Sequence, residues 1–143
     1  MTDTSKPPRS SCPINHAIEI LGDKWTLLVV RDMVFNHKRS FSELKAMPEG
    51  IATNILSERL VRLQRAGVIV RLADPVDGRR AEYELTKHGR RLVPVLLELM
   101  VWSGRHSSEV DVPMALVRRI EKDREGAAQE VLERLRAAER AKG

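Results

Sequence analysis

The spacing of apolar residues changes from helical to alternating only once along this 143-residue chain, and that change constrains the fold most strongly. Up to residue 67 apolar residues recur every three or four positions, which predicts amphipathic helices. Over residues 68–72 and 81–85 they occupy every second position, which predicts two β-strands. Asp77 and Gly78 lie between them and suit a turn with positive φ. After Thr86 the helical spacing returns. The pattern predicts a mainly α (α+β) chain with one β-hairpin.

Two helices are expected near the start of the chain. Residues 1–11 are polar and contain prolines, which predicts a flexible N-terminal arm. Pro13 suits the first position of a helix that ends at Gly22. Asp23 is placed to cap a second helix over about residues 24–36. Because that helix is apolar nearly all round, we expect it to be central and buried.

Two further helices are expected before the hairpin. Ser40 and Glu43 have the spacing of a capping box, which opens a short helix to about residue 47. An apolar stripe then follows, ended by Gly67; its members are Leu56, Leu60 and Leu63. Two helices joined by a short glycine-containing turn form a helix-turn-helix candidate. With the hairpin behind it, the order of elements predicts a winged helix-turn-helix domain.

The segment after the hairpin is also expected to be helical. A helix over about residues 87–103 is predicted to bend at Pro94 and to be apolar on two faces. A second face needs a covering partner, so this helix is a candidate dimer interface, through Leu92, Val93, Leu96, Leu97, Met100 and Val101. Residues 111–143 are helical by composition, with a break expected at Gly126.

The positive charge of the chain is concentrated. The formal net charge is +5, and residues 59–80 hold six arginines against two aspartates. Residues 107–143 are balanced, with eight basic and eight acidic side chains. A solvated face is the ordinary explanation of such a charge run, but here it lies on the helix-turn-helix and hairpin. Double-stranded DNA is therefore the expected partner.

The candidate DNA-binding residues follow from the direction of the Leu stripe. At 100° per residue, Thr53 and Ser57 flank the inward face while Asn54 and Glu58 point outward. Asn54 suits adenine, and Glu58 suits either cytosine or the orientation of an arginine. Arg59 can either brace the helices or contact a phosphate. The full candidate set is Thr53, Asn54, Ser57, Glu58, Arg59, Arg62 and, at the tip of the hairpin, Arg79 and Arg80.

Several motifs, taken together and in order, resemble a known family. They are Cys12-Pro13, Gly22-Asp23-Lys24-Trp25, Arg39-Ser40-Phe41-Ser42-Glu43-Leu44, Gly50-Ile51, Leu56-Ser57-Glu58-Arg59-Leu60, Leu63, Gly67, Glu82-Tyr83-Glu84-Leu85-Thr86, Gly89 and Trp102. Over residues 12–105 the chain resembles the HxlR-type winged-helix transcription regulators. The resemblance implies a cytoplasmic bacterial or archaeal homodimer, expected to repress, on a two-fold-related operator. It also implies a dimer interface built from terminal helices. The sequence departs from the family at the hairpin tip, residues 76–80, and in the tail after Ser107.

The single cysteine is a candidate sensor. Cys12 precedes a predicted helix start, where the helix dipole favours the reactive thiolate. The resemblance implies oxidant or electrophile sensing at this place, and the alternative is a small residue with no signalling role. One cysteine needs an intersubunit disulfide or an external thiol adduct to signal. A small-molecule or oxidant effector is therefore a possible partner.

Other classes of function are poorly supported by the sequence. We find no G-x-S-x-G, H-E-x-x-H or P-loop pattern and no metal-ligand spacing among the four histidines, so we expect no enzyme, cofactor or metal site. No secretory signal or membrane span is predicted, which favours the cytoplasm. The alternative function is a winged-helix module that binds an acidic protein partner. The predicted division is an arm at 1–11, a DNA-binding domain with its dimerisation helix at 12–106 and a helical extension at 107–143.

Overall fold

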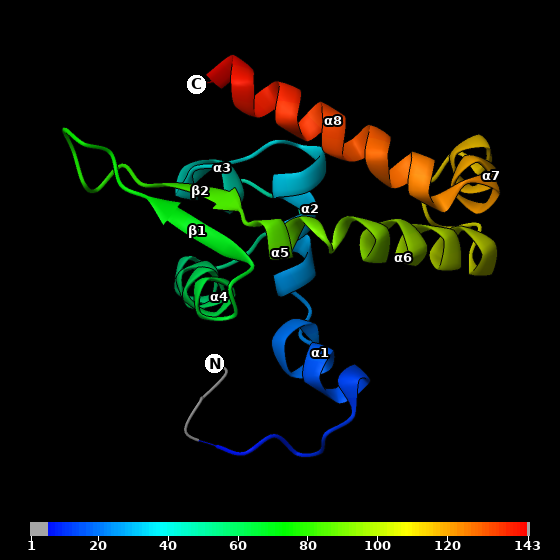
Figure 1. The fold of residues 1–143 in the computed structure, drawn as a ribbon, viewed down its shortest axis with the longest axis horizontal. Helices are drawn as coiled ribbons and strands as arrows, with labels where there is room; N and C mark the ends of the chain where they lie inside the picture. Colours follow the sequence, from blue (N-terminus) through cyan, green and yellow to red (C-terminus); the bar gives the residue numbers. More distant parts are fainter. Residues whose placement is uncertain (1–5, 143) are drawn as a thin grey trace. The chain divides into compact units, whose positions relative to one another are not determined.

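The structure is a computed structural model, and it describes residues 6–142. Its elements are shown in Figure 1: α1 (Pro13–Leu21), α2 (Thr26–Phe35), α3 (Phe41–Lys45), α4 (Thr53–Arg65), β1 (Ile69–Leu72), β2 (Glu82–Leu85), α5 (Lys87–Arg90), α6 (Val93–His106), α7 (Met114–Lys122) and α8 (Arg124–Lys142). The chain forms two compact units, one up to Gly89 and one from Arg90 onward. The predicted mainly helical fold with one β-hairpin is confirmed.

The predicted N-terminal arm lies only partly within the described residues. Residues 1–5 are outside them, and residues 6–11 are exposed and form neither helix nor strand. Arg9 is held by α1, because its Nε donates to Glu19 Oε1 at 3.1 Å. α1 begins at Pro13 and ends before Gly22, as predicted.

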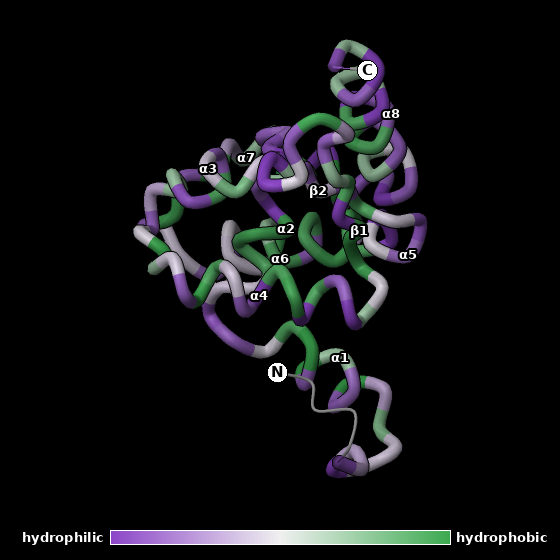
Figure 2. Tube along the Cα trace, turned by 90° about the vertical axis from the view of Figure 1, so that its left-hand side faces the viewer, coloured by the Kyte–Doolittle hydropathy of each residue, from purple (hydrophilic) through white to green (hydrophobic). Residues whose placement is uncertain are grey.

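The core of the first unit forms around α2. The apolar character of α2 (Figure 2) matches the full burial of Val29, Val30 and Val34. α2 contacts α1 on one side and α3 on the other, and α3 contacts α4. The predicted capping box is confirmed: Ser40 Oγ accepts the Glu43 N–H, and the Glu43 carboxylate accepts the Ser40 N–H. α2 also buries a carboxylate that the sequence pattern does not mark, Asp32.

The hairpin is antiparallel and is extended by one short bridge. Ile69 pairs with Leu85, and a β-bridge joins Ser40 to Glu82. Gly89, just after the hairpin, is buried so closely against the residue before β1 that an added Cβ would lie 2.0 Å from the Val68 carbonyl oxygen. The base of the hairpin is therefore fixed to both α3 and α5.

The turn of the hairpin differs from its prediction. Residues 73–81 link the two strands. Among the described glycines, Gly50 and Gly67 have a positive φ and Gly78 does not, so the prediction of a positive φ at Gly78 was wrong. The Asp74 carboxylate shapes the loop instead, because its Oδ1 accepts the N–H groups of Val76 and Asp77. A side-chain-closed turn of this kind removes the need for a left-handed residue.

The second unit packs α6, α7 and α8 against one another. The predicted single helix over 87–103 is instead two helices, with Pro94 in the first turn of α6, where its missing N–H has no helical acceptor to lose. The predicted break at Gly126 falls at Asp123, whose Oδ1 accepts the Gly126 N–H at 2.9 Å and caps α8. The predicted boundary at residue 107 lies between two helices of this unit and stays a prediction. Among the described helices, none has the length and hydropathy needed to cross a membrane.

Candidate nucleic-acid interface

The N-terminal end of α4 presents exposed polar side chains. Thr53, Asn54 and Ser57 are all exposed, while Leu56, Leu60 and Leu63 of the same helix are buried. Ala52 precedes the helix and supplies no side-chain cap, so the first N–H groups of α4 have no cap acceptor there. Free N–H groups and the positive end of the helix dipole attract phosphate or base acceptors. This end of α4 is therefore suited to a nucleic-acid groove.

The tip of the hairpin carries two exposed arginines. Arg80 is 83% exposed, and its Nε lies 3.9 Å from Asp77 Oδ2. Arg79 is exposed as well, and within residues 6–142 its side chain forms no ion pair. An arginine without a carboxylate partner is free to bind an external anion. Both guanidinium groups at the tip are therefore exposed and accessible to an external anion.

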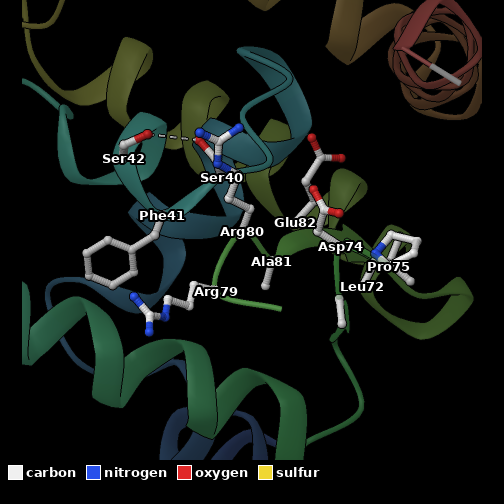
Figure 3. A pocket seen from close by; sticks show the side chains of 11 residues that line it. Ser40, Phe41, Ser42, Leu72, Asp74, Pro75, Arg79, Arg80, Ala81 and Glu82 are labelled. Atoms are coloured by element: carbon white, nitrogen blue, oxygen red, sulfur yellow. Dashed lines mark hydrogen bonds between the residues drawn. The ribbon is translucent and has the colours of Figure 1, made fainter. Parts of the chain in front are cut away.

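A groove of about 760 Å³ separates the start of α3 from the hairpin (Figure 3). Ser40, Ser42, Arg79 and Arg80 contribute its polar groups, together with Asp74 and Glu82. Both acids are already satisfied: Glu82 pairs with Arg39 at 3.2 Å, and backbone N–H groups of Val76 and Asp77 lower the pKa of Asp74. The groove therefore offers cations and hydroxyls to an anion. Its two walls lie thirty or more residues apart in the sequence, so no local spacing predicts the groove.

Arg39 ties the hairpin to the helix-turn-helix. Its Nη2 lies 2.7 Å from Glu84 Oε1, and its side chain is only 12% exposed. The Arg39 carbonyl also accepts the Tyr83 N–H at 2.7 Å. These contacts fix the direction in which the hairpin leaves the unit. Arg39 lies 45 residues from Glu84, so no local spacing rule could have paired them.

Arg59 and Arg62 face inward toward a shared acid. Arg59 Nε donates to Asp23 Oδ1 and Arg62 Nη1 donates to Asp23 Oδ2, each at 3.0 Å. Glu58 contacts both arginines, and its Oε1 lies 3.1 Å from Arg62 Nη2. For Glu58, the geometry favours the orientation of an arginine over a contact with cytosine. For Arg59, it favours bracing of the helices over a phosphate contact.

Asp23 is held firmly as an anion. It accepts the N–H groups of Trp25 and Thr26 as well as the Thr26 hydroxyl, and so caps the start of α2. Partial burial raises its pKa, but the hydrogen bonds from Thr26, Trp25 and Arg59 outweigh burial and hold the pKa well below its usual range. The sequence predicted the cap but not the two arginines, which lie 36 and 39 residues away.

The family-level comparison matches residues 20–111 to the HxlR-like helix-turn-helix model. The chain belongs to the HxlR-like helix-turn-helix family. The match covers α2 to α6 and so includes the α3–α4 pair and the hairpin. The chain is therefore a DNA-binding transcriptional regulator with a winged helix, as the motifs implied.

Individual relatives agree with this assignment. An uncharacterized HTH-type transcriptional regulator from Synechocystis sp., sll1512, is 39% identical over 62% of this chain, which spans 64% of that regulator's length. The crystal structure of PA1607, a protein assigned as a transcription factor, superposes with a TM-score of 0.64 at 33% identity, over 73% of this chain and 72% of that one. The oxidized redox regulator HypR gives a TM-score of 0.57 at 27% identity, over 69% of this chain and all of that one.

This HxlR-like chain exposes apolar side chains on α6 that differ from the predicted interface set. Val93, Leu96, Leu97 and Val101 are buried within the chain, whereas Leu92 and Met100 are partly exposed. The large exposed apolar residues of α6 form a stripe at helical spacing, Val95, Leu99 and Trp102. Apolar spacing alone cannot tell which of two stripes the chain itself covers.

α1 carries a second exposed apolar surface. Ile14 is 69% exposed and Ile18 is 51% exposed, and the helix has no buried residue. Cys12 is exposed as well, immediately before α1. An amphipathic helix whose apolar side chains stay this exposed in its own chain has an apolar face available to a partner.

Proposed function

We propose that this regulator binds DNA by inserting the N-terminal end of α4 into the major groove while the hairpin arginines contact phosphates. The carrying observation is that the first unit presents exposed Thr53, Asn54 and Ser57 on α4 and two exposed arginines, Arg79 and Arg80, at the tip of the hairpin. A helix-turn-helix protein contacts bases through the first residues of its second helix. Asn54 is assigned to adenine, since its amide matches the N6 and N7 edge.

The remaining predicted contacts are assigned by geometry. Thr53 and Ser57 flank Asn54 and reach bases or sugar-phosphate through hydroxyl groups. Glu58, Arg59 and Arg62 act mainly through one another and Asp23, so we assign them to positioning α4. Ser40 and Ser42 add hydroxyls beside Arg79 in the groove, which extends the phosphate-binding surface toward α3.

Replacing Arg79 and Arg80 by alanine tests the hairpin contacts. We expect operator and scrambled duplex to lose affinity alike, and the slope of log K against log salt to fall by about two, because each phosphate contact contributes about 0.9. Fluorescence anisotropy over a salt series measures both. Arg118→Ala, an exposed arginine of α7, is the matched control and should change little. Unchanged DNA binding in the double variant would instead favour the alternative module that binds an acidic protein.

We further propose a homodimer that represses transcription in the cytoplasm from a two-fold-related operator. In this proposal, residues 12–106 form the DNA-binding domain with its dimerisation helix, and 107–143 form an added helical extension. The exposed apolar stripes of α1 and α6 support self-association. In this proposal the regulator acts by binding DNA and catalyses no reaction. A chromatin-binding map with footprinting should reveal half-sites about one helical turn apart. A single unpaired half-site, or raised target expression with the protein present, would contradict the dimeric repressor.

Oxidant sensing through Cys12 is proposed as the effector response. The thiol is exposed, and the redox regulator HypR has a similar fold. Oxidation should join two Cys12 thiols across a dimer, or attach a small thiol to each, and should lower operator affinity about tenfold or more. Anisotropy before and after diamide treatment measures the effect, with Cys12→Ser as the control that should not respond. Equal affinity of the oxidised and reduced protein would remove the sensor.

A further inference from the structure

We infer that Asp23 and Glu58 set the DNA specificity of this regulator by withholding Arg59 and Arg62 from the phosphate backbone. The inference rests on the proposed use of α4 in DNA binding and identifies what limits its non-specific attraction. Neither acid is assigned a contact with DNA. Both are specificity-determining residues that act through the two arginines.

The geometry pairs both guanidinium groups with carboxylates inside the protein, and only Arg62 Nε among the nitrogens of Arg59 and Arg62 is buried without a hydrogen-bond partner. The two oxygens of Asp23 take one arginine each at 3.0 Å, while Glu58 contacts the same two arginines from their own helix. The arginine side chains are only 15% and 13% exposed. A phosphate would have to displace a carboxylate at nearly ideal distance before binding either of them.

The charge of this cluster is balanced. Two guanidinium cations meet two carboxylates, so the middle of α4 presents no net charge to DNA. The hydrogen bonds that lower the pKa of Asp23 keep it ionised throughout the neutral range. In contrast, Arg80 is 83% exposed with its Nε 3.9 Å from Asp77 Oδ2, and Arg79 forms no ion pair within residues 6–142, so both remain accessible to DNA phosphates.

Specificity depends on keeping Arg59 and Arg62 away from the DNA phosphates. Phosphate contacts add affinity for every sequence, whereas base contacts add affinity only for the operator. Freeing two arginines on α4, the helix proposed to enter the DNA major groove, would raise the affinity for DNA of any sequence. It would also allow α4 to settle in registers that do not align Asn54 with its base. The ratio of operator to scrambled affinity would therefore fall.

Asp23→Asn tests the inference with little change of shape, because the amide oxygen still accepts the N–H groups that cap α2. We expect scrambled-duplex affinity to rise about three- to tenfold, and the salt slope to steepen by one to two phosphate equivalents. The operator-to-scrambled ratio should fall about tenfold. Glu109→Gln, which removes the same charge from an exposed residue in the second unit, controls for net charge.

Two further variants keep the test decisive. Glu58→Gln changes a partly exposed residue away from the α2 cap, and it should raise scrambled affinity in the same direction even if Asp23→Asn folds poorly. Adding Arg59→Gln and Arg62→Gln to Asp23→Asn should reverse the gain in salt slope. The inference is overturned if Asp23→Asn and Glu58→Gln leave the scrambled affinity and slope at wild-type values or weaken all binding. Failure of the wild-type protein to bind any duplex would instead overturn the proposed function.

Discussion

Replacing Asp32 by alanine is expected to lower the free energy of unfolding of the first unit by about 3 kcal/mol. The carboxylate is fully buried in α2, and its oxygens accept Arg31 Nε at 3.1 Å, Asn36 Nδ2 at 2.9 Å and Lys38 Nζ at 3.1 Å. Its removal leaves two cations beside an emptied acceptor. The expected loss of unfolding free energy is at the lower end of the range for a buried ion pair that loses one partner. Both cations keep some solvent contact, and Arg31 retains its ion pair with Glu49.

The effect should extend from the core to the hairpin. The Asp32 carboxylate accepts the Asn36 amide N–H at 2.9 Å and the Lys38 ammonium at 3.1 Å, so its removal loosens the loop that ends α2. His37 in that loop has a φ of 54°, a conformation that the surrounding contacts must hold. The next residue but one, Arg39, anchors the hairpin through Glu84. Loosening the loop should therefore also weaken DNA binding.

Urea unfolding followed by circular dichroism measures the change in stability. Asp77→Ala, at an exposed position of the hairpin loop, is the matched control and should lose less than about 0.5 kcal/mol. Asp32→Asn should lose less than the alanine variant, because its amide oxygen still accepts one hydrogen bond. A loss below about 1 kcal/mol for Asp32→Ala would show that the buried carboxylate is not a central support of the fold.

Local rules of the sequence account for most of the first unit. The capping box at Ser40, the glycine that ends α4 and the alternation in β1 and β2 each depend on residues within a few positions of one another. Such signals are encoded in a single segment and can be recognised without its neighbours. The winged-helix order of elements followed from them, and so did the position of the polar end of α4.

Long-range pairing accounts for what the sequence missed. Asp23, which pairs with both Arg59 and Arg62, lies more than thirty residues from them, and Glu84 lies as far from Arg39. The Glu58–Arg62 pair, in contrast, has the local i,i+4 spacing. Periodicity placed Arg59 beside the apolar stripe but could not say whether its charged end turned toward an acid or toward solvent. Asp32 lies inside an apolar run, where a single charge is easily mistaken for an exposed position. Tertiary contacts, which no local spacing encodes, decide the arginine cases. The polar partners of Asp32 lie within six residues of it, and for this residue it is the burial that depends on tertiary packing.

Replacing Leu99 by glutamate is expected to break the proposed homodimer and to weaken operator binding about 10²- to 10⁴-fold. Leu99 lies at the middle of the exposed apolar stripe on α6, flanked by Val95 and by Trp102, which is 61% exposed. A charge at the centre of an interface must be desolvated without a partner, which costs more than association can return. A monomer binds one half-site and loses the gain from the second, tethered half-site.

Sedimentation velocity should show the Leu99→Glu protein as a monomer, with the wild-type protein a dimer at the same concentration. Leu116→Glu, at an exposed apolar position of α7, introduces the same charge outside the stripe and should leave the dimer intact. Binding to a single isolated half-site should be equal for wild type and Leu99→Glu, because the α4 contacts are unchanged. If Leu99→Glu remains a dimer, the α6 stripe is not the interface, and the exposed Ile14 and Ile18 face of α1 becomes the surface to alter next.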